Sequence, residues 1–188
     1  MHNRQFGLLV SILTSVALSL SAPLRADSPL SALTVEKGGA IILAGDDYRL
    51  EPWSWRPQPG TVQVVQYIPG TSDGNKLFKS LNDRMQRELD YTRYQLTVLV
   101  NLDAASWATR GIVKSRLVDK KRSFPGTVMV RDDDGLGVDQ WQLPEGLLFA
   151  IFDSSGALIA KQTRKPSEED LTHLFEQLQA TLAEVAGP

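Results

Sequence analysis

Three adjacent polar residues, Thr71, Ser72 and Asp73, have types and spacing that could do chemistry. They precede a segment with helical periodicity, so backbone N–H groups and the positive end of the helix dipole could hold an anion or a peptide there. The same side chains could equally serve as N-caps of that helix, and we favour this interpretation. A hydroxyl nucleophile would need a general base, and none lies convincingly nearby in the sequence. We therefore predict no catalytic residue and keep Thr71, Ser72 and Asp73 as a candidate binding loop.

Two clusters of charged residues offer other chemistry. Asp132, Asp133 and Asp134 precede Gly135 and could hold a cation, but an EF-hand loop alternates its ligands before the glycine, so we favour a solvated turn. The second cluster is basic and could meet phosphate groups, although a solvated helix face is the simpler interpretation. Its members are Arg110, Lys114, Arg116, Lys120, Lys121 and Arg122. Neither cluster predicts a metal site or a cofactor.

Cysteine is absent from the chain, and histidine occurs only as His2 and His173. The lack of cysteine excludes disulfides, thiolate metal sites and thiol catalysis. His173 lies in a strongly helical segment, where we expect it to face water rather than to serve a Ser-His-Asp triad or a zinc site. The net charge of −2 argues against a nucleic-acid-binding surface spread over the molecule.

Residues 1–26 have the three parts of a secretory signal peptide. Arg4 gives a basic start, the apolar run extends from Phe6 to Leu20, and Ala26 is a small residue at the cleavage position. The alternative is a membrane anchor, but a span needs ~20 residues and this run is shorter. We therefore expect cleavage after Ala26, a periplasmic protein of residues 27–188, and no stable membrane insertion.

Residues 27–60 are predicted to form an N-terminal hairpin and a turn-rich connector. Leu33–Glu36 and Ala40–Leu43 flank Lys37–Gly39, a pattern typical of a small β-hairpin. A further short strand is predicted at Tyr48–Trp53.

Residues 61–188 are predicted to form the main domain, in which strands and helices alternate. Runs of β-branched and apolar residues predict strands, and apolar residues spaced by three or four positions predict helices. The strands are expected at 61–68, 94–102, 127–130, 147–152 and 157–161, and the first two helices at 77–89 and 111–122. The second helix is expected to turn Ile112, Val113 and Leu117 inward.

The last helix has a clear start signal, because Pro166 and Ser167 are followed by three acidic residues. Serine is a preferred N-cap, and acids favour the positive end of the helix dipole. Its buried stripe is expected to hold Leu171, Leu174, Phe175, Leu178, Leu182 and Val185.

The order of these elements matches the α/β, three-layer thioredoxin-like layout of peroxiredoxins and exported thiol-disulfide oxidoreductases. Phe124–Gly135 and Trp141–Lys161 carry this likeness. A closer match is carried by Arg93–Ala105, Ser115–Pro125, Trp141–Leu143 and the start of the last helix, Pro166–Leu171. The chain resembles the YtfJ family, small exported bacterial proteins of thioredoxin-like fold and no settled function.

The resemblance implies that Ile68–Asn75 lies where thioredoxins carry their redox Cys-x-x-Cys. It also implies that Leu147 lies near their usual cis-proline position, with Pro144 about three residues too early. Hydroxyl and carboxylate groups cannot cycle between thiol and disulfide, so we exclude thiol-disulfide activity.

We therefore expect a non-redox binding or accessory protein that takes a periplasmic protein or peptide in the groove beside this loop. One alternative is a cysteine-independent enzyme that uses the Thr71–Asp73 loop. Another is the regulator role with which some family members are labelled, which the export signal disfavours by denying access to DNA. The sequence predicts no nucleic-acid partner and makes no prediction of oligomeric state.

Overall fold

A computed structural model describes residues 30–185 of the chain. The signal peptide and cleavage site predicted within residues 1–26 lie outside this range. Within it the strands are β1 (Leu33–Ala44), β2 (Asp47–Trp55), β3 (Val62–Pro69), β4 (Tyr94–Asn101), β5 (Val128–Asp132), β6 (Leu148–Phe152) and β7 (Leu158–Gln162). The helices are α1 (Lys79–Glu88), α2 (Trp107–Ser123), α3 (Leu136–Gln140) and α4 (Glu168–Val185), with a 3-10 turn, η1, at Gly74–Lys76.

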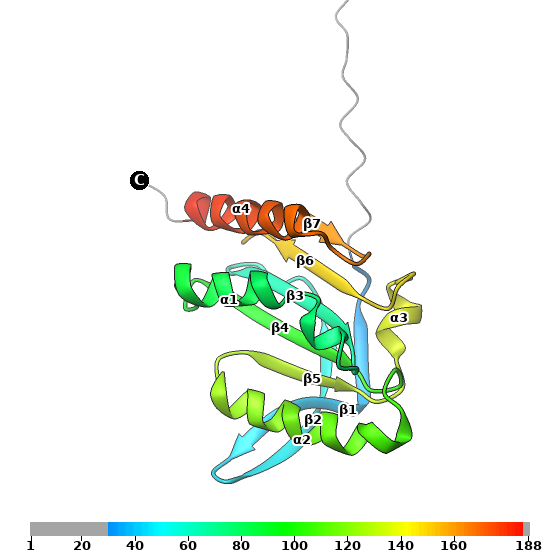
Figure 1. The fold of residues 1–188 in the computed structure, drawn as a ribbon. Coiled ribbons are helices and arrows are strands. Elements are labelled where there is room, and N and C mark those ends of the chain that lie inside the picture. Colours follow the sequence, from blue (N-terminus) through cyan, green and yellow to red (C-terminus); the bar gives the residue numbers. More distant parts are fainter. Residues whose placement is uncertain (1–29, 186–188) are drawn as a thin grey trace, which may run out of the picture.

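All of these strands belong to one sheet with the order β2-β1-β5-β4-β3-β6-β7 (Figure 1). The three strands β3, β4 and β5 are parallel, whereas β6 runs antiparallel to β3 and returns as β7. A parallel neighbour requires a crossover, and α1 and α2 provide the two crossovers. The strands and helices predicted after Thr61 are confirmed to within a few residues, while the short helix α3 was not predicted.

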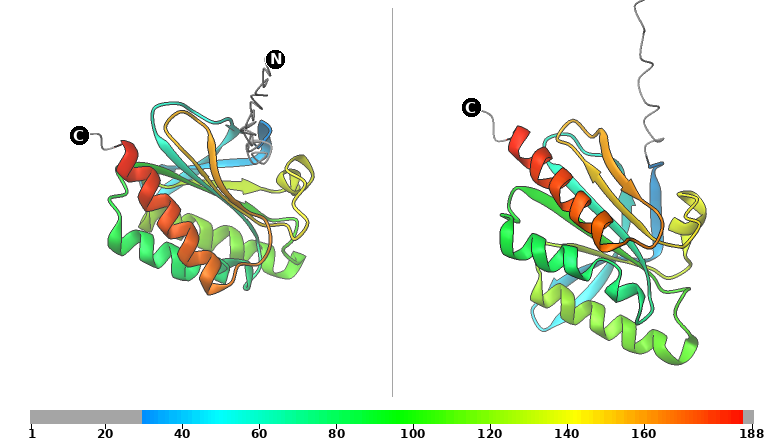
Figure 2. Two further views of the ribbon diagram at one scale, coloured as in Figure 1. Left: turned by 90° about the horizontal axis from the view of Figure 1, so that it is seen from above. Right: turned by 45° about the horizontal axis from the view of Figure 1, so that its top comes forward.

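Each face of the sheet has its own hydrophobic core. The helices α1, α2 and α4 cover one face (Figure 2), and the core between them and the sheet includes Phe78, Leu117, Phe149 and Phe175. The opposite core forms around Tyr67, where it is closed by side chains from the N-terminal hairpin and from around α3; among them are Leu33, Trp55, Trp141 and Leu143. None of the described helices is long and apolar enough to cross a membrane.

The N-terminal hairpin exists, but its predicted turn is wrong. The chain turns between β1 and β2, and Lys37–Gly39 lies inside β1 at a break in the pairing register. Gly38 and Gly39 have φ values of 100° and 84°. A Cβ on Gly38 would lie 2.3 Å from the carbonyl oxygen of Arg131. These two glycines therefore allow a kink and a close approach of neighbouring backbone within one long strand. Glycine serves this purpose within strands as well as in turns.

The inward face of α2 differs from the prediction at Ile112. Leu117 and Val118 are buried and Val113 is half-buried, but Ile112 is 54% exposed. At 3.6 residues per turn, Ile112 lies about 140° around the helix from Leu117 and so faces away from the sheet.

Gly111 occupies the interior of α2 without a structural need for glycine. A Cβ at this position would meet no atom within 4 Å. Because glycine costs about 0.5–1 kcal/mol relative to alanine within a helix, Gly111→Ala is expected to raise the free energy of unfolding by that amount. Urea denaturation measures it. Gly137→Ala is the matched control: its Cβ would lie 2.2 Å from the Tyr67 ring, so it should destabilise. A lowered midpoint for Gly111→Ala would contradict this account.

The start of α4 is capped as predicted. The Ser167 hydroxyl accepts a hydrogen bond from the Asp170 N–H (3.1 Å), and the Asp170 carboxylate accepts one from the Ser167 N–H (2.8 Å). The predicted stripe is buried at five positions, but Val185 is exposed, because it ends the helix. His173 is exposed, as predicted. The confirmed buried residues are Leu171, Leu174, Phe175, Leu178 and Leu182.

The Asp170 cap predicts a pH effect with a definite sign. The backbone hydrogen bond from Ser167 holds the pKa of Asp170 below its ordinary value of 3.8. The ionised Asp170 carboxylate therefore stabilises the folded state at neutral pH. This stabilisation is lost as the pH falls below about 4 and passes through the lowered pKa. Asp170→Asn should lower the melting temperature at pH 7, and the difference from wild type should shrink at about pH 3. Glu169→Gln is the control, because it removes a neighbouring charge and leaves the Ser167–Asp170 cap intact. An equal effect of both variants would contradict the prediction.

Candidate functional site

The loop of residues 70–73 follows β3 at the carboxyl end of the parallel strands, the usual place for ligand binding in such sheets. The Thr71 hydroxyl accepts a hydrogen bond from the Gly74 N–H (3.0 Å), so Thr71 caps the turn η1. The Asp73 carboxylate makes no capping bond and instead pairs with the Lys76 ammonium (3.2 Å). The capping interpretation therefore holds for Thr71 and not for Asp73. Ser72 is exposed on the loop.

A groove of about 800 Å³ opens beside this loop. Three segments far apart in the sequence form it: residues 69–83, residues 145–147, and residues 165–171 at the start of α4. Thr71 and Asp73 line the groove, whereas Ser72 does not. The structure thus brings two of the three predicted loop residues to the same cavity.

The groove has an apolar floor and a charged rim. Leu77, Leu147 and Leu171 supply apolar surface, and Pro69 and Pro166 add to it. Apolar cavities that carry a few well-placed polar groups are typical binding sites for small molecules and for peptide side chains.

Two carboxylates on the rim are held by neutral hydrogen-bond donors. The Glu145 carboxylate accepts a hydrogen bond from the Lys165 backbone N–H (2.8 Å), and the Ser80 hydroxyl donates to Glu168 (3.2 Å). Within residues 30–185, neither carboxylate has an ion-pair partner, nor does the Lys165 ammonium. Lys79 and Asp83 also line the groove but neutralise one another (2.5 Å). Glu145, Glu168 and Lys165 are therefore available to orient a ligand.

Leu147 lies where the resemblance implies a cis-proline position, and it lines the same groove as Thr71. It is buried directly before β6 and follows Gly146, whose φ is 63°. The two parts of the expected redox site therefore do meet in space. Neither part carries a group that could exchange disulfides.

The acidic run Asp132–Asp134 is not the solvated turn that we favoured. Asp132 ends β5 and is fully buried, where it accepts hydrogen bonds from the Tyr67 hydroxyl (2.8 Å) and the Gly137 N–H (2.9 Å). Burial, strengthened by the nearby Asp132 carboxylate, raises the pKa of the Tyr67 phenol far above its ordinary value. Tyr67 therefore remains protonated and donates to Asp132.

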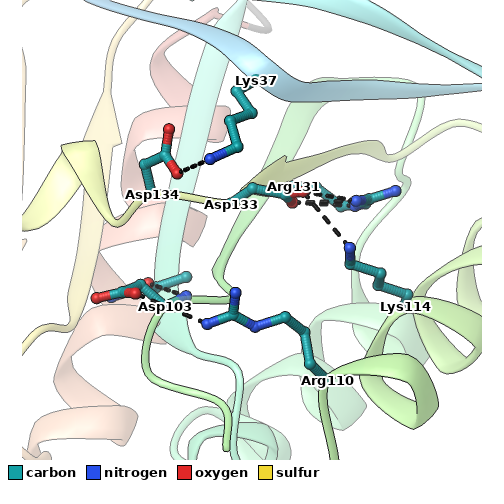
Figure 3. A network of polar contacts seen from close by, with 8 residues as sticks. Lys37, Asp103, Arg110, Lys114, Arg131, Asp133 and Asp134 are labelled. Atoms are coloured by element: carbon teal, nitrogen blue, oxygen red, sulfur yellow. Dashed lines mark hydrogen bonds and ion pairs between the residues drawn. The ribbon is translucent and has the colours of Figure 1, made fainter. Parts of the chain in front are cut away.

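The other two aspartates of the run point to different cations (Figure 3). Asp133 pairs with Arg131 (2.7 Å) and with Lys114 (3.6 Å), whereas Asp134 pairs with Lys37 (2.6 Å). Across residues 30–185, no group of three or more histidine, aspartate or glutamate side chains is arranged to hold a metal ion. This run therefore ties β1, β5 and α2 together.

The basic cluster on α2 is partly used within the fold. Arg110 lies 3.7 Å from Asp103, and Lys114 approaches Asp133 from the same side of the helix (Figure 3). The Lys121 ammonium donates to the carbonyl groups of Pro125 (2.7 Å) and Thr127 (2.8 Å). This is not an arrangement of free cations directed at one phosphate.

Sequence reasoning missed several residues that shape these sites. Glu145, Lys165 and Glu168 reach the groove only through the fold, and no spacing in the sequence connects them with residue 71. The Tyr67–Asp132 pair had one usable signal: the acidic run follows directly on a predicted buried strand.

Comparison with known proteins adds evidence on ancestry and fold. A family model described as "Bacterial protein of unknown function (YtfJ_HI0045)" matches residues 24–181. The uncharacterized protein YtfJ of Escherichia coli (strain K12) is 25% identical over 146 residues, which cover 77% of this chain and 79% of the relative. An uncharacterized protein of Haemophilus influenzae is 25% identical over 150 residues, covering 79% and 82%.

A solved structure shows the same type of fold. The thioredoxin domain of a thiol-disulfide oxidoreductase from Bacteroides vulgatus is similar with a TM-score of 0.53 and 14% sequence identity. The match covers 82% of this chain and 98% of that domain. At this identity the likeness establishes a thioredoxin-like fold, as predicted, and carries no information on activity.

Proposed function

Because the chain belongs to the YtfJ family, whose description assigns no activity, we propose a function from the site itself. The protein is a periplasmic, non-redox binding module that holds an extended polypeptide segment in the groove beside residues 70–73. The observation that carries this proposal is the groove, which Thr71, Asp73 and Leu147 line at the place where the resemblance implies the redox site of the fold.

The chemistry of the groove suits a polypeptide. Its leucine and proline surface can accept apolar side chains, while Glu145, Glu168 and Lys165 can pair with charged or backbone groups at the rim. Because the chain has no cysteine, such a site can still bind a polypeptide but cannot exchange disulfide bonds with it.

The enzyme alternative at this loop lacks a supporting contact. The Thr71 hydroxyl accepts from a backbone N–H, and the Asp73 carboxylate faces Lys76, so the two do not form a nucleophile–base pair. The regulator alternative requires contact with DNA and therefore a cytoplasmic protein, whereas our proposal requires a periplasmic one. The location of the mature protein distinguishes the two.

The compartment is tested by N-terminal sequencing of the protein released by osmotic shock. The signal features of residues 1–26 predict a mature chain that begins at Asp27. A chain that retains Met1 and is recovered from membranes or cytoplasm would overturn the periplasmic part of the proposal.

Binding is tested with residues 27–188 on a random peptide array, followed by titration of the selected peptides. The double variant Lys165→Glu/Glu168→Lys exchanges two rim charges, and we expect affinities to change by about tenfold or more, equivalent to about 1.4 kcal/mol. Ser72→Ala is the matched control, because Ser72 lies on the same loop outside the groove. Equal affinities for all three proteins would overturn the groove as the binding site.

The non-redox part of the proposal is tested separately in an insulin-reduction assay. Precipitation of insulin in dithiothreitol should proceed at the rate of the buffer alone. Acceleration by the purified protein would contradict the absence of thiol-disulfide exchange.

A further inference from the structure

The first half of α2 exposes an uncharged surface that the fold itself does not use. Trp107 is 92% exposed and Ile112 is 54% exposed. Ala108 and Gly111 are also exposed. Residues three or four positions apart on a helix adjoin one another, so Trp107 adjoins Gly111, and Ala108 adjoins both Gly111 and Ile112. We call Trp107, Ala108, Gly111 and Ile112 the α2 patch. A contiguous exposed apolar surface marks an interaction site more often than scattered single residues do.

The internal packing of the protein does not explain this patch. A Cβ on Gly111 would meet nothing within 4 Å, so no neighbouring element approaches the helix there. The tryptophans Trp55 and Trp141, in contrast, are buried in the core around Tyr67. In Figure 1 and in the right view of Figure 2, α2 lies at one end of the helical layer, with α1 between it and α4.

The charge on α2 is opposite to that of the rest of the protein. The helix contains six Lys or Arg residues and one acid, Asp119, which gives +5 on a chain whose net charge is −2, so that all other residues together carry −7. Such a separation of charge orients a protein toward an anionic surface.

Three of these cations have no carboxylate partner within residues 30–185. Lys120 contacts the Asn75 side-chain oxygen, Lys121 contacts backbone carbonyls, and Arg116 makes no ion pair in this range. Arg116 lies one helical turn after Ile112, so free positive charge adjoins the α2 patch.

We propose that the α2 patch docks on an anionic lipid surface. Trp107 and Ile112 enter the headgroup region, while Arg116 and Lys120 approach lipid phosphates. Aromatic and aliphatic side chains beside basic residues on one helix are the usual composition of a membrane-surface contact. A lipid surface fits better than a protein partner, because the unpaired charges near the patch share one sign and the apolar groups project from an outer helix face. The proposal goes beyond groove binding and does not depend on it.

Vesicle sedimentation with residues 27–188 tests the proposal; this chain contains every described element and omits the apolar segment 6–20. We expect binding to vesicles that contain phosphatidylglycerol and much weaker binding to pure phosphatidylcholine. Trp107→Ser/Ile112→Ser should lower the partition coefficient by about tenfold or more. Arg116→Glu/Lys120→Glu should lower it similarly and reduce its dependence on salt. Tyr91→Ser is the control, since Tyr91 is exposed outside α2, and it should bind as wild type does.

Fluorescence provides an independent readout on the same samples. Because Trp107 is far more exposed than Trp55 or Trp141, vesicles should shift the wild-type emission to shorter wavelength, and the shift should vanish in the Trp107→Ser variant. Equal binding to both vesicle types, or unchanged binding of the patch variant, would overturn the proposal. A dimer in sedimentation equilibrium that the patch variant abolishes, without vesicle binding, would assign the patch to a second copy of the chain and also overturn it.

Discussion

Phe175→Ala is expected to lower the free energy of unfolding by about 3–5 kcal/mol, the usual cost of truncating a buried phenylalanine. Phe175 is fully buried on α4 and belongs to the core between the helices and the sheet. The Arg84 guanidinium also lies 3.9 Å from the centre of its ring, so the variant loses a cation–π contact as well. Small domains are stable by only about 5–15 kcal/mol, so the urea midpoint should fall sharply.

His173→Ala is the control on the same helix. His173 faces water, and surface substitutions usually change stability by less than about 0.5 kcal/mol. If the two variants unfold at the same urea concentration, the packing of α4 described above is wrong.

Asp132→Ala is expected to cost about 2–6 kcal/mol, since two buried polar groups lose their partner and each such loss costs about 1–3 kcal/mol. The substitution leaves the Tyr67 hydroxyl and the Gly137 N–H without their shared acceptor in the core. Thermal and urea denaturation of the purified domain would measure the loss.

Two controls locate this effect. Tyr67→Phe removes one donor and retains the Gly137 contact, so it should cost less than Asp132→Ala. Asp134→Ala breaks a largely exposed pair with Lys37, which is worth about 0–1 kcal/mol. Equal losses for Asp132→Ala and Asp134→Ala would contradict the buried role of Asp132.

The fold from residue 61 onward was predictable because its elements carry strong local patterns. The LLFAIF run of β6 is buried on both faces, and Ser167 with Asp170 marks the start of α4. Where prediction failed, long-range contacts decide the local structure. Gly38 and Gly39 resemble a turn in the sequence, but the close approach of β2 and β5 to β1 requires glycine within a strand.

The three aspartates illustrate a second limit of sequence reasoning. An acidic run suggests solvent exposure, yet β5 continues through Asp132 and carries its carboxylate to Tyr67. Helix α3 is too short for periodicity to indicate it, and a bond from Gly137 to the same carboxylate supports it.

The candidate site was predictable in part. The resemblance placed residues 71–73 and Leu147 at one site, and the groove lined by Thr71, Asp73 and Leu147 agrees with that expectation. Ser72 is not part of the groove lining, whereas Glu145, Lys165 and Glu168 are. Both results depend on how the loop and α4 are placed, which local patterns do not encode.

The most direct test of the account is an amide chemical-shift map of residues 27–188 titrated with a peptide selected from a random library. A binding module that uses this groove predicts saturable shifts concentrated at residues 69–73, 145–147 and 165–168, with the Lys165→Glu/Glu168→Lys variant displaced in affinity and the peptide recovered chemically unchanged. Saturable shifts confined to other parts of the domain, or a peptide that is cleaved or modified during the titration, would contradict it.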